Sequence, residues 1–301
     1  MIRVTQSRQS GLALQAITLA RARLLERQRV AMSGQRVNKP SDDPAAAARA
    51  RLMGELDARA ASHRTAANYG VSRLGTADAA LGEGGNILLR ARQLATAMAN
   101  DTMSADERTA AAAEVASLRR AMIDVMNTRY GDEYVFAHVD TRSPPYDANT
   151  GFTYDVDSYD DVREAEVGPT QRVEIGASGS HAFAQRVADP NSVDVISQLS
   201  DLETDLRNDD ADSIRADIDG IATAFDQVLA ERTRVGVRMA DLRRADEAAS
   251  QASSVYEALR SDLVDADAAE AFSQLSLAEN TMQAAVAVAS RVLGPSLLDA
   301  G

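Results

Sequence analysis

Side chains that could do catalytic or metal chemistry are few in this sequence, and they are widely spaced. His63, His138 and His181 stand alone, and none has an Asp or Glu at metal-ligand spacing on a shared helix face. The chain has no cysteine, which excludes thiol catalysis, cysteine-ligated zinc and disulfide bonds. We therefore predict no catalytic residue, no metal site and no cofactor, and a protein that is not an enzyme.

Two segments resemble the beginnings of ligand-binding loops. Residues 147–151 start like a calcium loop, but the twelfth position, where the bidentate Glu belongs, is Ser158. A hairpin turn is expected there instead. The glycine-rich residues 82–85 follow no predicted strand and are not a phosphate loop. Four nearby aspartates are expected to form a solvated acidic surface: Asp155, Asp157, Asp160 and Asp161.

Charge and hydropathy exclude further classes of function. The chain of 301 residues carries a net charge of −13, which argues against general nucleic-acid binding, because phosphate contacts need clustered cations. It has no run of 18 apolar residues, so we expect no membrane-inserted helix. Residues 1–6 lack the apolar core of a signal peptide. By these signals the protein is cytoplasmic, or it is exported by a route that cleaves nothing.

The two ends of the chain are amphipathic and opposite in charge. Residues 1–36 contain seven arginines against the single acid Glu26, whereas residues 261–298 are acidic and have Arg291 as their basic residue. Apolar residues at alternating steps of three and four predict a helix seam in each end. The N-terminal seam comprises Ala13, Ile17, Ala20, Leu24 and Ala31. The C-terminal seam comprises Phe272, Leu275, Glu279, Met282, Val286, Ala289 and Leu293, and Gly294-Pro295 ends it.

These patterns predict that the two ends lie side by side and neutralise each other's charge. The alternative is two separate surface helices, each packed on a globular core. Because an Ala-rich seam buries little apolar surface, we also expect both ends to fold only when the protein assembles.

Proline placement predicts the rest of the architecture. All seven prolines lie outside residues 45–143 and 191–294, so those blocks are expected to be helical. Eight of the twelve aromatic residues fall between positions 130 and 183, among short alternating runs and turn residues, which predicts a small β-rich insert. The expected fold is mainly α. It is an elongated antiparallel helical bundle or coiled coil built from both termini, with the insert added.

Three domains are predicted from this map. Residues 1–40 and 262–301 form a terminal coiled-coil assembly region. Residues 41–130 and 191–261 form a helical middle domain, and residues 131–190 form an outer β-rich domain.

Residues 33–45, Ser-Gly-Gln-Arg-Val-Asn-Lys-Pro-Ser-Asp-Asp-Pro-Ala, resemble the N-terminal signature of the flagellin superfamily. Residues 265–270, Asp-Ala-Asp-Ala-Ala-Glu, with the Leu/Ala/Gln-rich continuation, are similar to the other end of the same superfamily. The shared pattern covers roughly residues 1–130 and 210–301. Residues 131–137, 167–173 and 234–238 are similar to the branch that joins the hook to the filament.

This resemblance implies a structural subunit of the bacterial flagellum, secreted without a cleaved signal peptide through the flagellar type III export channel. Implied partners are copies of itself in a ring or helical layer, the other hook-associated junction protein, flagellin, and an export chaperone on the C-terminal segment. Flagellin itself is the alternative, and a peripheral membrane-binding protein is a further one, because a basic amphipathic helix can lie on anionic lipid.

Candidate site residues are those expected to form the assembly interface. They combine seam residues, N-terminal arginines and the polar residues of the two motifs: Ile17, Arg21, Arg23, Leu24, Arg27, Asn38, Asp42, Asp43, Asp265, Asp267, Phe272, Leu275, Met282, Val286 and Leu293.

Overall fold

The computed structural model describes residues 2–137, 140–157 and 163–293. Side-chain positions are described for these residues except near the helix ends, at 2–7, 9, 10, 292 and 293. His138, Ser158, Asp160, Asp161 and the Gly294-Pro295 helix stop therefore lie outside the described residues.

The chain divides into two compact units. The terminal unit comprises Met1–Arg59 and Ala252–Gly301, and the central unit comprises Ala60–Gln251. Two long helices, α2 (Pro44–Met98) and α6 (Ala211–Val264), contribute residues to both units. The division into three domains at the boundaries given above stays a prediction.

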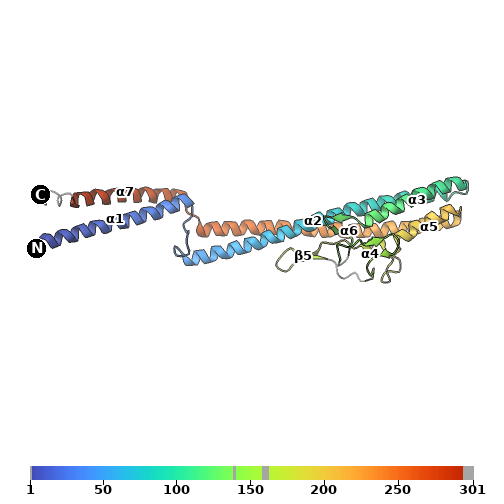
Figure 1. Ribbon diagram of the computed structural model, residues 1–301, viewed down its shortest axis with the longest axis horizontal. Coiled ribbons are helices and arrows are strands. Elements are labelled where there is room, and N and C mark those ends of the chain that lie inside the picture. Colours follow the sequence, from blue (N-terminus) through green and yellow to red (C-terminus); the bar gives the residue numbers. More distant parts are fainter. Residues whose placement is uncertain (1, 138–139, 158–162, 294–301) are drawn as a thin grey trace. The chain divides into compact units, whose positions relative to one another are not determined.

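The central unit is built on four helices (Figure 1). Here α2 and α6 lie side by side with α3 (Ala105–Met126) and α5 (Val195–Arg207). Ion pairs join α2 to α6, including Arg232 to Asp78 with Nε–Oδ1 at 2.9 Å. Apart from Pro44, the first residue of α2, all four helices fall in the proline-free blocks, so the predicted helical content is confirmed. Glycines such as Gly70 do not interrupt α2, and a Cβ there would lie 2.6 Å from Ile175 and 2.8 Å from Leu242.

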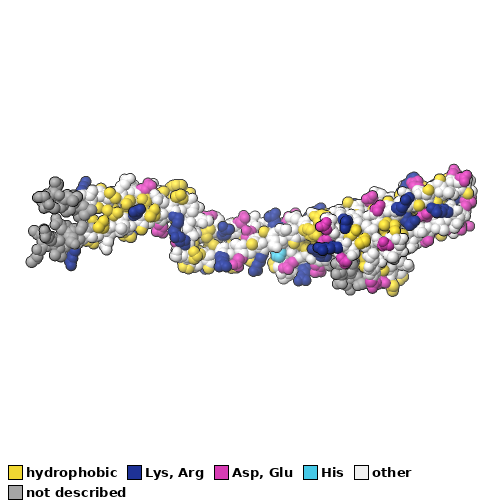
Figure 2. All heavy atoms as spheres, viewed as in Figure 1, with side chains coloured by type: hydrophobic (Ala, Val, Ile, Leu, Met, Phe, Trp, Pro, Cys, Tyr) yellow, Lys and Arg dark blue, Asp and Glu magenta, His cyan; other side chains and the backbone are white. Residues whose placement is uncertain are grey.

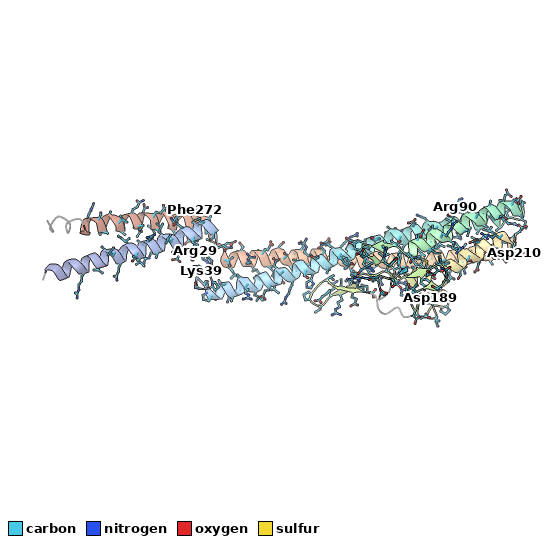
Figure 3. The ribbon with its side chains drawn as sticks, viewed as in Figure 1. Arg29, Lys39, Arg90, Asp189, Asp210 and Phe272 are labelled. Carbon is cyan, nitrogen blue, oxygen red and sulfur yellow. The ribbon has the colours of Figure 1, made fainter. Side chains whose placement is uncertain are left out.

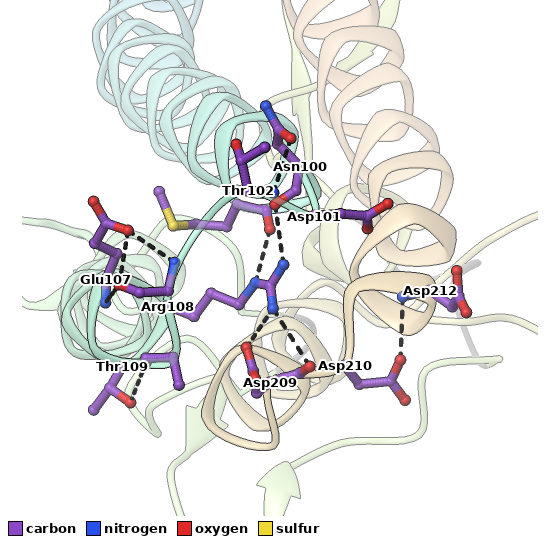
Figure 4. A network of polar contacts seen from close by, with 12 residues as sticks. Asn100, Asp101, Thr102, Glu107, Arg108, Thr109, Asp209, Asp210 and Asp212 are labelled. Atoms are coloured by element: carbon purple, nitrogen blue, oxygen red, sulfur yellow. Dashed lines mark hydrogen bonds and ion pairs between the residues drawn. The ribbon is translucent and has the colours of Figure 1, made fainter.

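Two connections between helices meet at one end of the central unit (Figure 4). Ser104 and Glu107 form a capping box that starts α3. Arg108, which is 5% exposed, donates hydrogen bonds to the carbonyl oxygens of Met98 at 3.0 Å and Asn100 at 3.1 Å. Its guanidinium also pairs with the carboxylate of Asp209, the residue with a positive φ before α6. One buried arginine therefore ties the α2–α3 connection to the α5–α6 connection.

The insert consists of short antiparallel hairpins. Its three strand pairs are β1 (Arg129–Tyr130) with β2 (Glu133–Tyr134), β3 (Tyr146–Asp147) with β4 (Gly151–Phe152), and β5 (Glu164–Glu166) with β6 (Arg172–Glu174). A short helix, α4 (Gly179–Phe183), follows. At the β3–β4 turn the Asp147 carboxylate accepts from the backbone N–H groups of Asn149 and Thr150, so the predicted hairpin turn is confirmed.

Two buried charges hold the insert on the helices. Arg73 of α2 is 1% exposed and donates to the carbonyl oxygens of Ile175 and Tyr134. Glu231 of α6 is fully buried and accepts from the backbone N–H of Ser178 at 3.1 Å. Backbone groups of the insert therefore satisfy part of the hydrogen bonding of these two charges, which would be costly to leave buried without partners. The insert thus shares the core of the central unit.

In the terminal unit, α1 (Ile2–Ser33) and α7 (Ala268–Leu293) run antiparallel and side by side (Figure 1). The first described turns of α1 and the last described turns of α7 are at the same end of this pair. The two ends of the chain therefore pack together, as predicted. Among the described residues, no helix has the length and apolar character needed to cross a membrane.

Candidate functional site

The α1–α7 contact uses the seam that the sequence predicts on α1. Buried or half-buried positions recur along this helix at steps of three and four, and they include every predicted seam residue: Ala13, Ile17, Ala20, Leu24 and Ala31. Ala20 is 6% exposed. Ile17 and Leu24, both candidate assembly residues, therefore contribute to a contact within the chain.

On α7 the buried face is shifted from the predicted seam. It comprises Ala271, Gln274, Leu275, Ala278, Met282, Ala285 and Ala289. Leu275, Met282 and Ala289 were predicted there. Phe272 and Val286 are instead 58% and 47% exposed, and Glu279 is exposed as well. Small alanine side chains let the two helix axes approach closely, whereas the seam prediction selected the bulkier residues. The side chain of Leu293 lies outside the described residues.

Apolar side chains flank the buried face on both sides of the helix pair. With 3.6 residues per turn and antiparallel helices, the exposed large apolar residues separate into two sets. One set, here called the Phe272 face, comprises Leu14, Leu25 and Met32 of α1 with Phe272 and Val286 of α7. The other, the Leu277 face, comprises Leu12 and Leu19 of α1 with Leu277 and Val288 of α7. Figure 2 shows hydrophobic side chains gathered over these helices.

The expected charge neutralisation within the pair does not occur through ion pairs in the part of the chain that the structure describes. Arg21, Arg23 and Arg27 are exposed, and none forms an ion pair with a described residue. The reason is helical geometry. Arg23 projects on the Leu277 face and Glu279 on the Phe272 face, so the pair separates them. Neutralisation of the two oppositely charged ends stays a prediction.

The connections at the inner ends of α1 and α7 are joined by main-chain hydrogen bonds. Gly34 ends α1 with a φ of 68°, and its carbonyl oxygen accepts from the N–H of Ala266 at 2.9 Å. The N–H of Arg36 donates to the Val264 carbonyl at 2.7 Å, and its guanidinium donates to the Leu263 carbonyl at 2.8 Å. We call this set of contacts, residues 34–43 with 263–267, the junction.

Two candidate aspartates organise the N-terminal half of the junction, near Arg29 and Lys39 in Figure 3. Asp42 accepts from the backbone N–H groups of Lys39 at 2.9 Å and Asn38 at 3.1 Å, and from the Arg29 guanidinium at 3.3 Å. Desolvation acts to raise the pKa of Asp42, but these hydrogen bonds and charges outweigh it and lower the pKa. Asp43 caps α2, and the hydrogen bond from the Ala46 N–H lowers the pKa of its carboxyl group.

The remaining candidate polar residues also have local structural contacts. The side-chain amide of Asn38 donates to the Gln35 carbonyl at 2.6 Å. Asp265 accepts from the Ser261 hydroxyl at 2.6 Å, and Asp267 accepts from the N–H groups of residues 269 and 270 at the start of α7. The junction therefore brings together five candidate residues, and the side chains of all but Asp265 bond to main-chain groups.

Sequence reasoning missed two groups of residues in the terminal unit. Arg36 was not singled out, because its partner carbonyl is 227 positions away in the chain. The exposed leucines of α1 were also missed, although apolar residues outside a heptad seam are a signal of a second contact surface.

No catalytic arrangement is present among the described residues, and they contain no group of three or more His, Asp or Glu side chains that could hold a metal ion. A polar cavity of about 180 Å³ in the central unit is lined by residues that include His181, Arg186 and Arg234. Burial, together with nearby arginines, lowers the pKa of His181 to about 4, so the imidazole is neutral near pH 7.

Comparisons with known proteins point to one family. Residues 7–141 match the model of the bacterial flagellin N-terminal helical region. Flagellar hook-associated protein 3 of Escherichia coli (strain K12) is 24% identical over 94% of this chain and 95% of its own length. The protein of the same name from Salmonella typhimurium is 23% identical over 88% and 89%.

A solved structure shares the fold. The crystal structure of the flagellar junction protein FlgL from Legionella pneumophila superposes with a TM-score of 0.59 at 14% identity, covering 72% of this chain and 100% of that one. The N-terminal part of the chain therefore matches the flagellin N-terminal family, and over most of its length the chain is a homologue of proteins named flagellar hook-associated protein 3.

Proposed function

We propose that this chain is a structural subunit of the bacterial flagellum that joins the hook to the filament as a hook-associated junction protein. The relatives over most of the chain carry that name, and none of the names reported above denotes an enzyme. The subunit acts by assembling and not by turning over a substrate.

The observation that carries this proposal is the distribution of exposed apolar residues. Sixteen large hydrophobic side chains are exposed in the described part of the chain, and twelve of them belong to the terminal unit. Soluble monomers rarely expose contiguous apolar surface, so such a concentration marks an interaction site. Burying this surface is favourable by about 25 cal/mol per Å². The terminal unit is therefore the part that neighbouring molecules cover.

The placement of these residues supports an open or ring-like assembly. A self-complementary patch closes two molecules into a dimer, whereas two different faces allow each molecule to bind one neighbour on each side. The Phe272 face and the Leu277 face lie on opposite sides of the α1–α7 pair. Copies of this chain can thus continue from one to the next in a ring or helical layer.

The other partners follow from the same role. The layer contacts the other hook-associated junction protein on one side and flagellin on the other. Before assembly an export chaperone holds the C-terminal segment, roughly residues 272–293, which bears the exposed Phe272. The subunit leaves the cell through the flagellar type III export channel without losing a signal peptide, and it resides in the extracellular flagellum.

Deleting the gene and examining the cells and medium by microscopy tests this function. A junction role predicts cells without filaments that shed flagellin into the medium, and a copy of the gene should restore filaments. Cells that lack filaments and shed no filament protein would indicate flagellin itself. Cells with ordinary filaments would contradict both roles.

Sedimentation with anionic vesicles tests the membrane alternative. The arginines and leucines of α1 could face lipid, but α1 has no aromatic residue to anchor at an interface. We expect the purified protein to stay in the supernatant.

A further inference from the structure

The terminal unit holds charged side chains that find no partner within the described chain. Arg23 and Arg27 are exposed on α1, next to Leu12 and Leu19 of the Leu277 face. Glu279 is exposed on α7, between Phe272 and Val286 of the Phe272 face. Each helix therefore presents apolar residues and a charge of one sign on the same strip of surface.

The residues of the two strips lie at similar distances from the junction, measured along the helix axes. Counted outward from the Gly34–Ala266 hydrogen bond, Arg23 and Glu279 lie at about the same distance from the junction. Leu12 and Val286, and Arg27 and Phe272, agree to within about one helical turn. Because the matching strips lie on opposite sides of one molecule, they can meet only between two molecules.

We infer that in the assembled layer α1 of one copy lies against α7 of the next. This rests on the proposed function. Leu12, Arg23 and Arg27 of the first copy face Phe272, Glu279 and Val286 of the second. Arg23 then pairs with Glu279, Leu12 packs near Val286, and the Arg27 guanidinium lies close enough to Phe272 for a cation–π contact.

Charge selects this arrangement over like-on-like stacking. Placing α1 against α1 brings Arg23 and Arg27 of one copy toward Arg21 of the other, and like charges at an interface are unfavourable. Placing α7 against α7 gives Glu279 no cation near its level, because Arg291, the basic residue of α7, lies 12 positions further out. The contact of α1 with α7 avoids the repulsion between arginines, pairs Glu279 with Arg23 and buries apolar residues from each helix.

Cysteine cross-linking in isolated flagella tests the contact. The chain has no cysteine, so introduced pairs react alone. Ala16 lies on the Leu277 side of α1 and Gln283 on the Phe272 side of α7, both are exposed, and they agree in distance from the junction to within one residue. We expect oxidised flagella carrying Ala16→Cys with Gln283→Cys to give a ladder of dimers, trimers and larger species on a non-reducing gel. The matched control, Ala16→Cys with Thr18→Cys, reports α1 against α1 and should stay monomeric.

A ladder from the control pair, or monomers only from the first pair in normally assembled flagella, would overturn the inference and leave the junction role intact. Absence of the native protein from flagella would instead remove the proposed function. If the cysteine variants do not assemble, exchanging the charges of Arg23 and Glu279 tests the contact instead. Arg23→Glu and Glu279→Arg should each abolish motility and the combined variant should restore it, whereas a combined variant that stays immotile contradicts the pairing.

Discussion

Arg108 shows how one side chain can define the end of a helical unit. Replacing it by Ala leaves the carbonyl oxygens of Met98 and Asn100 without their donor and the Asp209 carboxylate without its cation. We expect the free energy of unfolding of the central unit to fall by about 2–4 kcal/mol, measured by urea denaturation. The control is Arg120, which is exposed and bonds to a carbonyl of its own helix. Arg120→Ala should change the free energy of unfolding by less than about 0.5 kcal/mol. Equal effects of the two changes would contradict this role.

Asp217 makes the stability of the central unit depend on pH. Burial, together with Asp205, Asp201 and Asp210, raises the pKa of its carboxyl group from 3.8 to about 7. The folded state then keeps a proton that the unfolded state loses, so the stability contributed by this proton is present below about pH 4 and is lost as pH rises toward 7. We expect Asp217→Asn to stabilise the protein at pH 8 by roughly 2 kcal/mol and to have little effect at pH 4.

Thermal unfolding at both pH values measures the effect of Asp217. The exposed Asp219 lies half a turn away on α6, and Asp219→Asn is the control that should show no such difference between pH 4 and pH 8. A decline in stability between these pH values that persists unchanged in Asp217→Asn would show that other groups cause it.

At the scale of the elements, the α1–α7 pair is weak in isolation. Its buried face is mostly alanine, while ordering the backbone costs roughly 1–2 kcal/mol per residue. Burying a large side chain such as Leu returns only about 1.5–3 kcal/mol, and Ala returns less. We expect limited proteolysis of the purified monomer to remove roughly the first 40 and last 40 residues and leave the rest. In assembled flagella the same ends should resist the protease. Slow hydrogen exchange of both helices in dilute monomer would contradict this expectation.

The sequence predicts elements better than it predicts contacts between them. Proline-free blocks and opposite charges at the ends indicate long helices and paired termini, because both depend on local patterns. The buried face of α7 was missed, because alanines carry a weak hydrophobic signal although they allow the closest helix approach. The contacts of Arg36 and Arg108 link residues far apart in sequence, and no local pattern reports them. The roles of the candidate assembly residues stay predictions.

At the scale of the whole molecule, we propose that the arginines of α1 serve assembly and not the folding of the central unit. Replacing Arg21, Arg23 and Arg27 together by Glu should impair swimming, because the outer charge of α1 is then reversed. The urea denaturation of the central unit should not change, since none of the three has an ion pair with a described residue. Motility on soft agar and the unfolding curve are the two measurements.

The matched control for this reversal uses the central unit. Arg92, Arg120 and Arg243 are exposed there and have no ion pair with a described residue. Their joint replacement by Glu should leave swimming intact if charge on α1 is what matters. Normal swimming of the α1 variant, or equal loss in both variants, would contradict an assembly role for these arginines.

The Gly34–Ala266 bond has a consequence for how such a chain can change in length. It fixes the register of two antiparallel helices, so the level of every residue on α1 is set relative to α7. Removing seven residues from α7 alone preserves its buried face but leaves two further turns of α1 uncovered. Insertions and deletions are therefore tolerated only when both helices gain or lose the same number of heptads. The lengths of the two ends of the chain must then change together.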